Sequence, residues 1–169
     1  MEKELYLCKV HSNYIKYLHS IDNRVSVKYN NRPYVGLITM INGIKYVLPL
    51  TSQTTTERKK SGKGKRSALI TTFVRDTNGE EIANILHNNM IPIKNDCYEI
   101  IDVDATVDTV DTYEANEIRF IRKNKEKIIE KAQKVHDKRI LNNNVFLNKT
   151  CCDFQKLEIS YQNFNLDLY

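Results

Sequence analysis

The sequence lacks the features that would place the protein in a membrane or a secretory pathway. Its longest apolar stretch, Tyr34 to Ile41, is far shorter than the roughly 20 residues needed to span a bilayer. The N-terminus carries charges at Glu2, Lys3 and Glu4 and shows no secretory hydrophobic segment followed by a small-residue cleavage site. We therefore expect a soluble, cytoplasmic protein.

Motifs for metal binding are absent as well. The four cysteines form no C-x-x-C pair, the four histidines are scattered, and no zinc-ligand spacing is present. The acidic segment Asp102 to Asp111 lacks the glycine and the terminal glutamate of an EF-hand loop, so we expect a solvated connection there. The prediction is therefore no metal and no cofactor. The thiols are expected to be buried or incidental, and they are Cys8, Cys97, Cys151 and Cys152.

The composition fits a single ordinary domain over residues 1–169. With 41% hydrophobic and 28% charged residues, the chain is neither disordered nor collagen-like nor a coiled-coil rod. The net charge of +5 is too small to indicate a nucleic-acid partner by itself. The charge is unevenly distributed, however. Six basic residues lie between Arg58 and Arg66, whereas the segment 102–111 holds four aspartates and no basic residue.

The clearest local signal is a β-hairpin. Apolar, β-prone residues run from Tyr34 to Ile41, and a second such run covers Ile44 to Leu48. Between them, Asn42 and Gly43 tolerate the positive φ that a type I′ turn requires. Pro49 is expected to weaken the pairing at the end of the second strand. Upstream, alternation over 4–9 predicts a strand, and Ser12 is expected to cap a short helix with apolar positions Tyr14, Leu18 and Ile21.

The middle of the chain predicts a mobile loop and further strands. Residues 51–66 are hydroxyl-rich and then basic, contain two glycines and have no apolar period, so we expect a mobile loop. Residues 68–74 predict a strand, closed by a turn at 76–79. The short apolar pieces 82–86 and 90–93 are interpreted as strands, although 80–87 is also compatible with a turn or two of helix.

Two helices are expected in the C-terminal third. A long helix near 112–141 should begin at Asp111, where Glu114 completes a capping box, and end at the asparagines 142–144. Asp153 should cap a C-terminal helix, because Phe154, Leu157, Tyr161 and Phe164 recur at helical spacing. The overall prediction is an α+β protein with a compact, strongly bent antiparallel sheet and helices packed on it.

Three groups of residues have functional potential, and each has a plain structural alternative. Thr51 and Ser52 lie where a strand leaves the sheet, a common place for catalytic groups, but they can equally satisfy turn backbone groups. Tyr29 can stack on a base or transfer a proton, and Arg32 can hold a phosphate, or both can belong to an ordinary surface loop. The basic segment 58–66 suits an RNA backbone or is a solvated hairpin tip.

Together these groups are compatible with metal-free RNA cleavage. That reaction requires deprotonation of the 2′-hydroxyl, protonation of the leaving 5′-oxygen and stabilisation of the phosphorane charge. Hydroxyls, a tyrosine and cations can share these tasks. No paired carboxylates, glycine-rich nucleotide loop or G-x-S-x-G elbow points to a different chemistry.

An ordered series of short motifs resembles the ToxN/AbiQ family, the toxins of type III toxin–antitoxin systems. The resemblance runs from about residue 4 to the final helix with similar gaps. Each motif is weak alone, but the ordered series is specific. The motifs are Ser12–Leu18, Arg32–Gly36, Gly43–Ser52, Met90–Ile93 and Ile118–Ile121.

The resemblance implies a fold and a function. It implies a bent sheet related to the SH3-like barrel of other ribonuclease toxins. It also implies a metal-independent, sequence-selective endoribonuclease that leaves a 2′,3′-cyclic phosphate and a 5′-hydroxyl. The inhibitor would be an antitoxin RNA that the toxin cuts from a tandem-repeat transcript and that folds into a closed, ring-like assembly with it. Cellular or phage RNA would be the substrate, and the system would abort phage infection or maintain a plasmid.

The resemblance also implies site residues. Thr51 and Ser52 match the family's Thr-Ser pair, and Tyr29 and Arg32 take the place of an upstream tyrosine and basic residue. Thr54 stands where relatives can carry a lysine, so that charge would come from Arg58, Lys59 or Lys60, or the role would be filled differently. The RNA backbone would be held by Arg58, Lys59, Lys60, Lys63, Lys65 and Arg66.

Two other functions remain open from the sequence. One is an RNA-binding regulator without catalysis, which would retain RNA but not cut it. The other is a structural or protein-interaction domain whose basic segment is incidental, which would show no RNA affinity above a neutral control.

Overall fold

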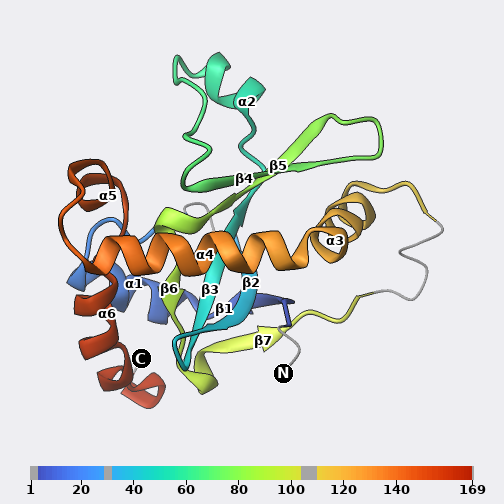
Figure 1. Ribbon diagram of the computed structural model, residues 1–169. Coiled ribbons are helices and arrows are strands. Elements are labelled where there is room, and N and C mark those ends of the chain that lie inside the picture. The colour runs from blue at the N-terminus through green and yellow to red at the C-terminus, as the bar shows by residue number, and fades with distance from the viewer. Residues whose placement is uncertain (1–3, 29–31, 104–109, 169) are drawn as a thin grey trace.

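The computed structural model describes residues 4–28, 32–103 and 110–168. One antiparallel sheet of seven strands is flanked by helices, and the longest helix, α4 (Lys125–Ile140), crosses in front of the sheet in Figure 1. The predicted α+β class with an antiparallel sheet is therefore confirmed. None of the helices in the described parts of the chain is long and apolar enough to cross a membrane.

The strands follow the order β4-β5-β3-β2-β1-β7, and β6 pairs with β3 beside this path. Within the described residues, no pairing joins β4 to β7, so the sheet is open and a closed SH3-like barrel is not confirmed. The strands are β1 (Tyr6–Val10), β2 (Tyr34–Ile41), β3 (Ile44–Thr51), β4 (Thr71–Arg75), β5 (Glu81–Leu86), β6 (Ile91–Pro92) and β7 (Tyr98–Ile100).

The predicted hairpin is confirmed as β2 and β3. Its turn residues Asn42 and Gly43 have φ values of 52° and 81°, as the type I′ preference requires. The two strands approach closely at Gly36, which lies opposite Pro49. A Cβ at Gly36 would come within 2.6 Å of the Leu48 carbonyl oxygen, so only glycine fits.

The pairing of β3 with β2 ends at Pro49, as expected, but the strand itself continues. It changes partner instead: Leu50 and Thr51 leave β2 and pair with Ile85 and Asn84 of β5. This change of partner bends the sheet, because one strand belongs to both halves. Thr51 is the last residue of the strand, which confirms that the hydroxyl pair lies where the chain leaves the sheet.

The smaller strand predictions were partly right. Strand β5 confirms the interpretation of 82–86 as extended, and the helical alternative for 80–87 is wrong. Strand β4 begins only at Thr71, because Ile70 N–H donates to Ser67 O in a turn. Of 90–93, only Ile91–Pro92 pairs as β6. Two 3-10 turns, η1 (His87–Asn89) and η2 (Asn95–Cys97), flank β6 in the chain.

Helix α1 (Ser12–Ile21) is present, but Ser12 is not its cap. The side chain of His11 accepts the N–H of Asn13 at 3.2 Å and takes that role. Tyr14 and Leu18 are buried in the core as predicted, and Ile21 is partly buried against it; Ile15, which was not predicted, is buried as well.

The prediction of a mobile loop over 51–66 was wrong for its central part. Residues Thr55–Lys60 form helix α2, capped by Thr54, whose hydroxyl accepts the N–H of Glu57. No residue of α2 is buried, which explains why no apolar period announces it. The hydroxyl at Thr54 and the carboxylate at Glu57 act as start signals instead.

The long helix expected near 112–141 is two helices. Helix α3 (Tyr113–Lys123) and α4 meet at Asn124, whose non-helical backbone (ψ 16°) interrupts the helix, and Figure 1 shows their axes diverging there. Asn124 donates from its side chain to Phe120 O, which stabilises the break. Thr112, not Asp111, caps α3. Asp102 and Asp111 are exposed, whereas Asp104 and Asp108 lie outside the described residues.

The C-terminal helix is shorter than predicted. Asp153 does cap it, accepting from Lys156 N–H at 3.1 Å, but α6 covers only Phe154–Ser160. Two 3-10 turns follow, η3 (Tyr161–Asn163) and η4 (Leu166–Leu168). A short helix that was not predicted, α5 (Val145–Thr150), precedes α6 and is capped by Asn144.

The core lies between the sheet and the helices. Its largest buried side chains include Tyr14, Tyr46 and Phe154, and the rings of Tyr46 and Phe154 pack edge to face at 5.9 Å. The prediction that the cysteines are buried thiols is confirmed, since all four are free and buried.

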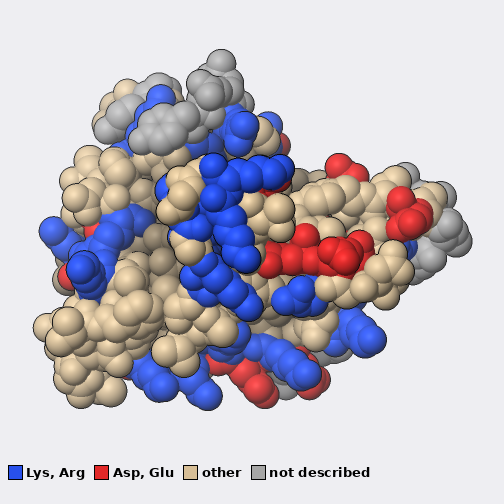
Figure 2. Space-filling model, turned by 90° about the horizontal axis from the view of Figure 1, so that it is seen from above, with Lys and Arg blue, Asp and Glu red and all other residues tan. Residues whose placement is uncertain are grey.

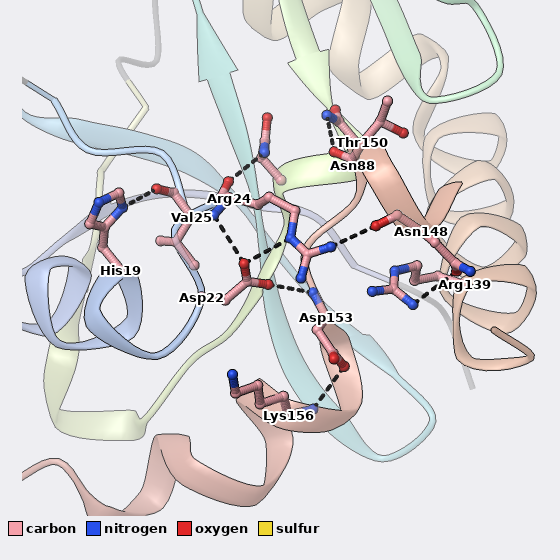
Figure 3. Close-up of polar contacts among 11 residues, drawn as sticks. His19, Asp22, Arg24, Val25, Asn88, Arg139, Asn148, Thr150, Asp153 and Lys156 are labelled. Atoms are coloured by element: carbon pink, nitrogen blue, oxygen red, sulfur yellow. Dashed lines mark hydrogen bonds and ion pairs between the residues drawn. The ribbon is translucent and has the colours of Figure 1, made fainter. Parts of the chain in front are cut away.

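A partly buried ion pair fixes the start of the connection from α1 to β2 (Figure 3). The Asp22 carboxylate accepts from Arg24 Nε at 2.8 Å and from Asp153 N–H at 2.6 Å. Arg24 donates onward to the carbonyl of Asn148 at 2.6 Å. The connection is thereby tied to both α5 and α6 before it runs on to Lys28.

Candidate active site

A pocket of about 810 Å³ opens where β3 leaves the sheet. It is bounded by the segment that follows β3, by the α1–β2 connection and by α2, with β5 and α3 on the remaining side. The residues that line it are Val27, Lys28, Arg32, Thr51, Ser52, Gln53, Thr54, Glu57, Ser61, Glu81, Ile82 and Tyr113. The structure therefore brings together three of the four predicted catalytic residues, Thr51, Ser52 and Arg32.

The two hydroxyls of the site have different surroundings. Thr51 is half-buried, and its hydroxyl oxygen accepts the N–H of Gln53 at 3.1 Å, an arrangement typical of a turn. Ser52 is exposed, and among the described residues its hydroxyl has no hydrogen-bond partner. Ser52 is therefore free to interact with a substrate, whereas Thr51 also shapes the backbone.

The pocket holds two cations, Lys28 and Arg32, on the connection that precedes β2. In the described parts of the chain, neither pairs with a carboxylate. Burial and the neighbouring positive charges of Arg66 and Arg32 lower the pKa of Lys28. The two carboxylates that line the pocket, Glu57 and Glu81, bind Lys60 and Thr55 instead, so Lys28 and Arg32 remain available to an anionic ligand such as a phosphodiester.

The predicted Tyr29 lies outside the described residues. The tyrosine that the described structure places in the pocket is Tyr113, at the start of α3, which donates a hydrogen bond to Ile82 O. Burial and the nearby carboxylate of Glu117 raise its pKa, so the ring is a neutral hydrogen-bonding and stacking group. Burial also raises the pKa of Glu117, to about 7.

Five of the six predicted RNA-binding cations surround α2. Figure 2 looks down on the face that carries α2 and shows Lys and Arg side chains gathered in a band, with acidic side chains to one side. Lys59 and Lys63 are exposed, and Lys60 pairs with Glu57 at 3.3 Å. Lys65 lies 4.9 Å from the ring centre of Phe73, and Arg58 donates to Gly64 O.

The sixth, Arg66, is half-buried and bonds to other parts of the protein. Its guanidinium donates to the carbonyl of Gln53 at 2.6 Å, to the Gln53 side chain at 3.0 Å and to Asn84 Oδ1 at 3.0 Å. Burial and the charge of Arg58 lower the pKa of Arg66 to about 10, which leaves it charged at neutral pH. Arg66 thus contacts Gln53, which lines the pocket.

A second hollow of about 820 Å³ adjoins the pocket and shares Lys28 and Arg32 with it. Its other basic residues are Lys9 and Lys16, and Tyr98 offers an aromatic surface. The second hollow also contains the carboxylates of Asp96 and Glu99, and the two hollows meet at Lys28 and Arg32 on the α1–β2 connection. Among the described residues, no group of three or more His, Cys, Asp or Glu side chains is placed to hold a metal ion.

Comparison with known proteins decides the family. Residues 6–162 match the family model of the toxin ToxN of type III toxin–antitoxin systems. The chain belongs to the ToxN family. The resemblance to the ToxN/AbiQ family is thus confirmed.

Three ToxN-family relatives cover most of the chain. The endoribonuclease ToxN of Bacillus thuringiensis subsp. kurstaki is 30% identical over 92% of this chain and 81% of its own length. The endoribonuclease AbiQ of Lactococcus lactis subsp. lactis is 28% identical over 88% of this chain and 83% of its own length. The endoribonuclease ToxN of Pectobacterium atrosepticum is 28% identical over 92% and 91%.

Solved ToxN-family structures have the same fold. A type III toxin described with its selective inhibition by a non-coding RNA pseudoknot superposes with a TM-score of 0.74 and 27% identity, covering 95% of this chain and 97% of its own. The lactococcal anti-phage endoribonuclease AbiQ gives a TM-score of 0.73, with coverage of 94% and 96%; at 22% identity this supports the fold alone.

Sequence reasoning missed Lys28 and Tyr113 and did not foresee the contacts of Arg66 with Gln53 and Asn84. Lys28 lies outside every motif that indicated the family, and Tyr113 looks like an ordinary first helical residue. The sequence did offer a partial signal that Arg66 lies close to the sheet. It is the last basic residue before Ser67–Ile70 and the following strand, where the chain must return to the sheet.

Proposed function

We propose that this chain is a metal-independent, sequence-selective endoribonuclease toxin of a type III toxin–antitoxin system, acting in the cytoplasm. Its products would be a 2′,3′-cyclic phosphate and a 5′-hydroxyl. One observation carries the proposal: the exposed Ser52 hydroxyl shares a pocket with the cations Lys28 and Arg32, which have no carboxylate partner among the described residues.

In the proposed reaction, the scissile phosphate lies between Ser52 and the two cations. Arg32 and Lys28 neutralise the charge that develops on the phosphorane, where preorganised cations have their largest effect. Ser52 and Thr51 position the phosphate by hydrogen bonding, and one of them takes part in proton transfer. Tyr29 orients the 2′-hydroxyl or a neighbouring base.

RNA on either side of the scissile phosphate follows the basic surface. The cations around α2 hold the backbone on one side, and the second hollow with Lys9 and Lys16 accepts it on the other. Since these contacts go to phosphates, they contribute affinity rather than base preference.

The proposed partner is a repeat-derived antitoxin RNA. A structural relative is inhibited selectively by a non-coding RNA pseudoknot, and we extend this mode of inhibition to the present chain. The toxin would cut the precursor and remain bound to the folded product in a ring-like assembly. The relation of its open, bent sheet to the SH3-like barrels of other ribonuclease toxins stays a prediction.

The test is to incubate the purified protein with a long RNA in the presence of EDTA and to map the ends. We expect cuts at a short preferred sequence, with cyclic phosphate and 5′-hydroxyl ends. Binding without cuts would favour the RNA-binding regulator, and affinity no greater than that of a neutral control would favour an interaction domain. Cleavage that stops in EDTA would contradict metal independence.

A further inference from the structure

Arg66 makes contacts that differ in kind from those of the other cations in the basic segment. Its three hydrogen bonds all go to protein groups, namely the backbone and side chain of Gln53 and the side chain of Asn84. Lys63, three residues earlier, is exposed. Three of the five N–H donors of this half-buried guanidinium are therefore engaged by the protein.

The partners of Arg66 are themselves fixed. Asn84 is fully buried on β5 and pairs with Thr51 in the sheet register. Its amide donates to Glu81 Oε2 at 2.9 Å and to the carbonyl of Ala83 at 2.7 Å. Arg66 is therefore bound to an immobile part of the sheet rather than to another flexible side chain.

Glu81, which accepts a hydrogen bond from Asn84, also holds the segment of chain that follows Ser52. Glu81 accepts the N–H of Thr55 at 2.6 Å and its hydroxyl at 2.7 Å. Three contacts therefore fix the backbone around Ser52. Thr51 pairs with Asn84 in the sheet, Gln53 accepts a hydrogen bond from Arg66, and Thr55 donates to Glu81. The Ser52 hydroxyl projects from a segment whose backbone is held on both sides.

We propose that Arg66 is a positioning residue of the active site, whose guanidinium holds Gln53 and thereby sets the place of the Ser52 hydroxyl, instead of binding RNA. The inference rests on the proposed endoribonuclease function. The arginine fork is essential to it, because a lysine keeps the charge but cannot bridge the Gln53 carbonyl, the Gln53 amide and Asn84 together. A lysine would replace arginine well if the role were only to attract phosphates.

The experiment compares Arg66→Lys, Arg66→Gln and Lys63→Gln in single-turnover cleavage and in RNA binding over a range of salt concentrations. Lys138→Gln, an exposed lysine on α4 away from the pocket, is the control for loss of a charge. We expect Arg66→Lys and Arg66→Gln each to lower the rate at saturating RNA about 10- to 100-fold, since small displacements of reacting groups cost rates of this order. The salt dependence of binding should stay unchanged in both.

Lys63→Gln should do the reverse, raising the half-saturating RNA concentration and flattening the salt dependence. The proposal is overturned if Arg66→Lys cleaves at the wild-type rate. It is also overturned if Arg66→Gln flattens the salt dependence as Lys63→Gln does, which would make Arg66 a phosphate-binding residue. Absence of cleavage by the wild-type protein would instead contradict the proposed function, so the two failures are distinguishable.

Thermal unfolding shows whether the variants fold. Should the Arg66 variants fail to fold, Gln53→Ala gives an independent test, because it leaves every charge in place and removes one of the three hydrogen bonds. A loss of about fivefold in the saturating rate is expected, the usual effect of one hydrogen bond. An unchanged rate in a folded Gln53→Ala protein would overturn the proposal.

Discussion

Two arginines of this protein, Arg24 and Arg66, hold neighbouring segments of chain in different ways. Arg24 pairs with the Asp22 carboxylate, whose side chain is 2% exposed, and ties the α1–β2 connection to α5 and α6. Arg66 bonds to the neutral groups of Gln53 and Asn84. The first cluster lies within the fold, whereas the second borders the pocket, because Gln53 and Glu81 both line it.

The difference separates stability from function. Arg24 holds segments of chain that lie away from the pocket, whereas Arg66 holds Gln53 in the pocket lining and also acts on Lys28 there. Its charge is one cause of the lowered pKa of Lys28. We therefore expect damage to the Asp22 cluster to change the stability of the protein and damage around Arg66 to change its activity.

The largest expected effect is on stability, from Asp22→Ala. The change leaves Arg24 without its carboxylate and the N–H of Asp153 without its acceptor, so the free energy of unfolding should fall by about 3 kcal/mol. Chemical denaturation measures this, with the exposed Asp167→Ala as control. A loss below about 1 kcal/mol would mean that the pair behaves as a surface ion pair.

Lys28 provides the corresponding test in the pocket. Lys28→Met should lower the cleavage rate about 100-fold, because the phosphorane is then stabilised by one preorganised charge fewer. The wild-type rate should also fall as the pH rises through the lowered pKa of Lys28, since only the protonated amine stabilises the phosphorane. In the Lys28→Arg variant, this fall of the cleavage rate at alkaline pH should occur at a higher pH. If the cleavage rate fell at the same pH in both proteins, Lys28 would be excluded as the cause of the fall.

The cleavage rate should fall as the pH rises, but the free energy of unfolding should fall as the pH decreases, because of His87. This histidine is fully buried, and burial, followed by the charge of Lys131, lowers its pKa to about 3. The unfolded chain binds the proton near pH 6.5, so stability is complete above that pH and is lost as the pH falls towards 3. Between pH 7 and 5 the loss should be about 2 kcal/mol. His87→Gln, which does not titrate, should show a flatter profile by denaturation; the same slope in both proteins would contradict this.

Much of the fold was predictable because it depends on local signals. The Asn42-Gly43 hairpin and the Asp153 cap are set by neighbouring residues and were predicted correctly. The break at Asn124 and the helix α2 were not, because one asparagine in a strong helical pattern carries a weak signal and an exposed helix needs no apolar face.

The site was predictable only in part. Thr51, Ser52 and Arg32 were found through family motifs, and the structure places them in one pocket. Lys28 and the contacts of Arg66 depend on tertiary packing, since Asn84 and Gln53 are distant from Arg66 in the chain. Composition cannot distinguish an arginine that binds RNA from one that holds the backbone.

The smallest expected effect comes from the exposed lysines near α2. Replacing Lys59, Lys60, Lys63 and Lys65 by glutamine should flatten the salt dependence of RNA binding by about 0.7 in logarithmic slope for each phosphate that the protein no longer neutralises. Electrophoretic or fluorescence titration over a range of salt concentrations measures this. An unchanged slope would show that these side chains do not touch phosphates, and the difference from Arg66 would disappear.

The central claim, that the pocket at the end of β3 cleaves RNA, is tested most directly by the single-turnover rate of Ser52→Ala at saturating RNA. The account predicts a rate at least about 100-fold below that of the wild type, with antitoxin RNA binding still measurable and growth arrest abolished on expression. A folded Ser52→Ala protein that cleaves RNA at the wild-type rate and remains toxic would contradict it.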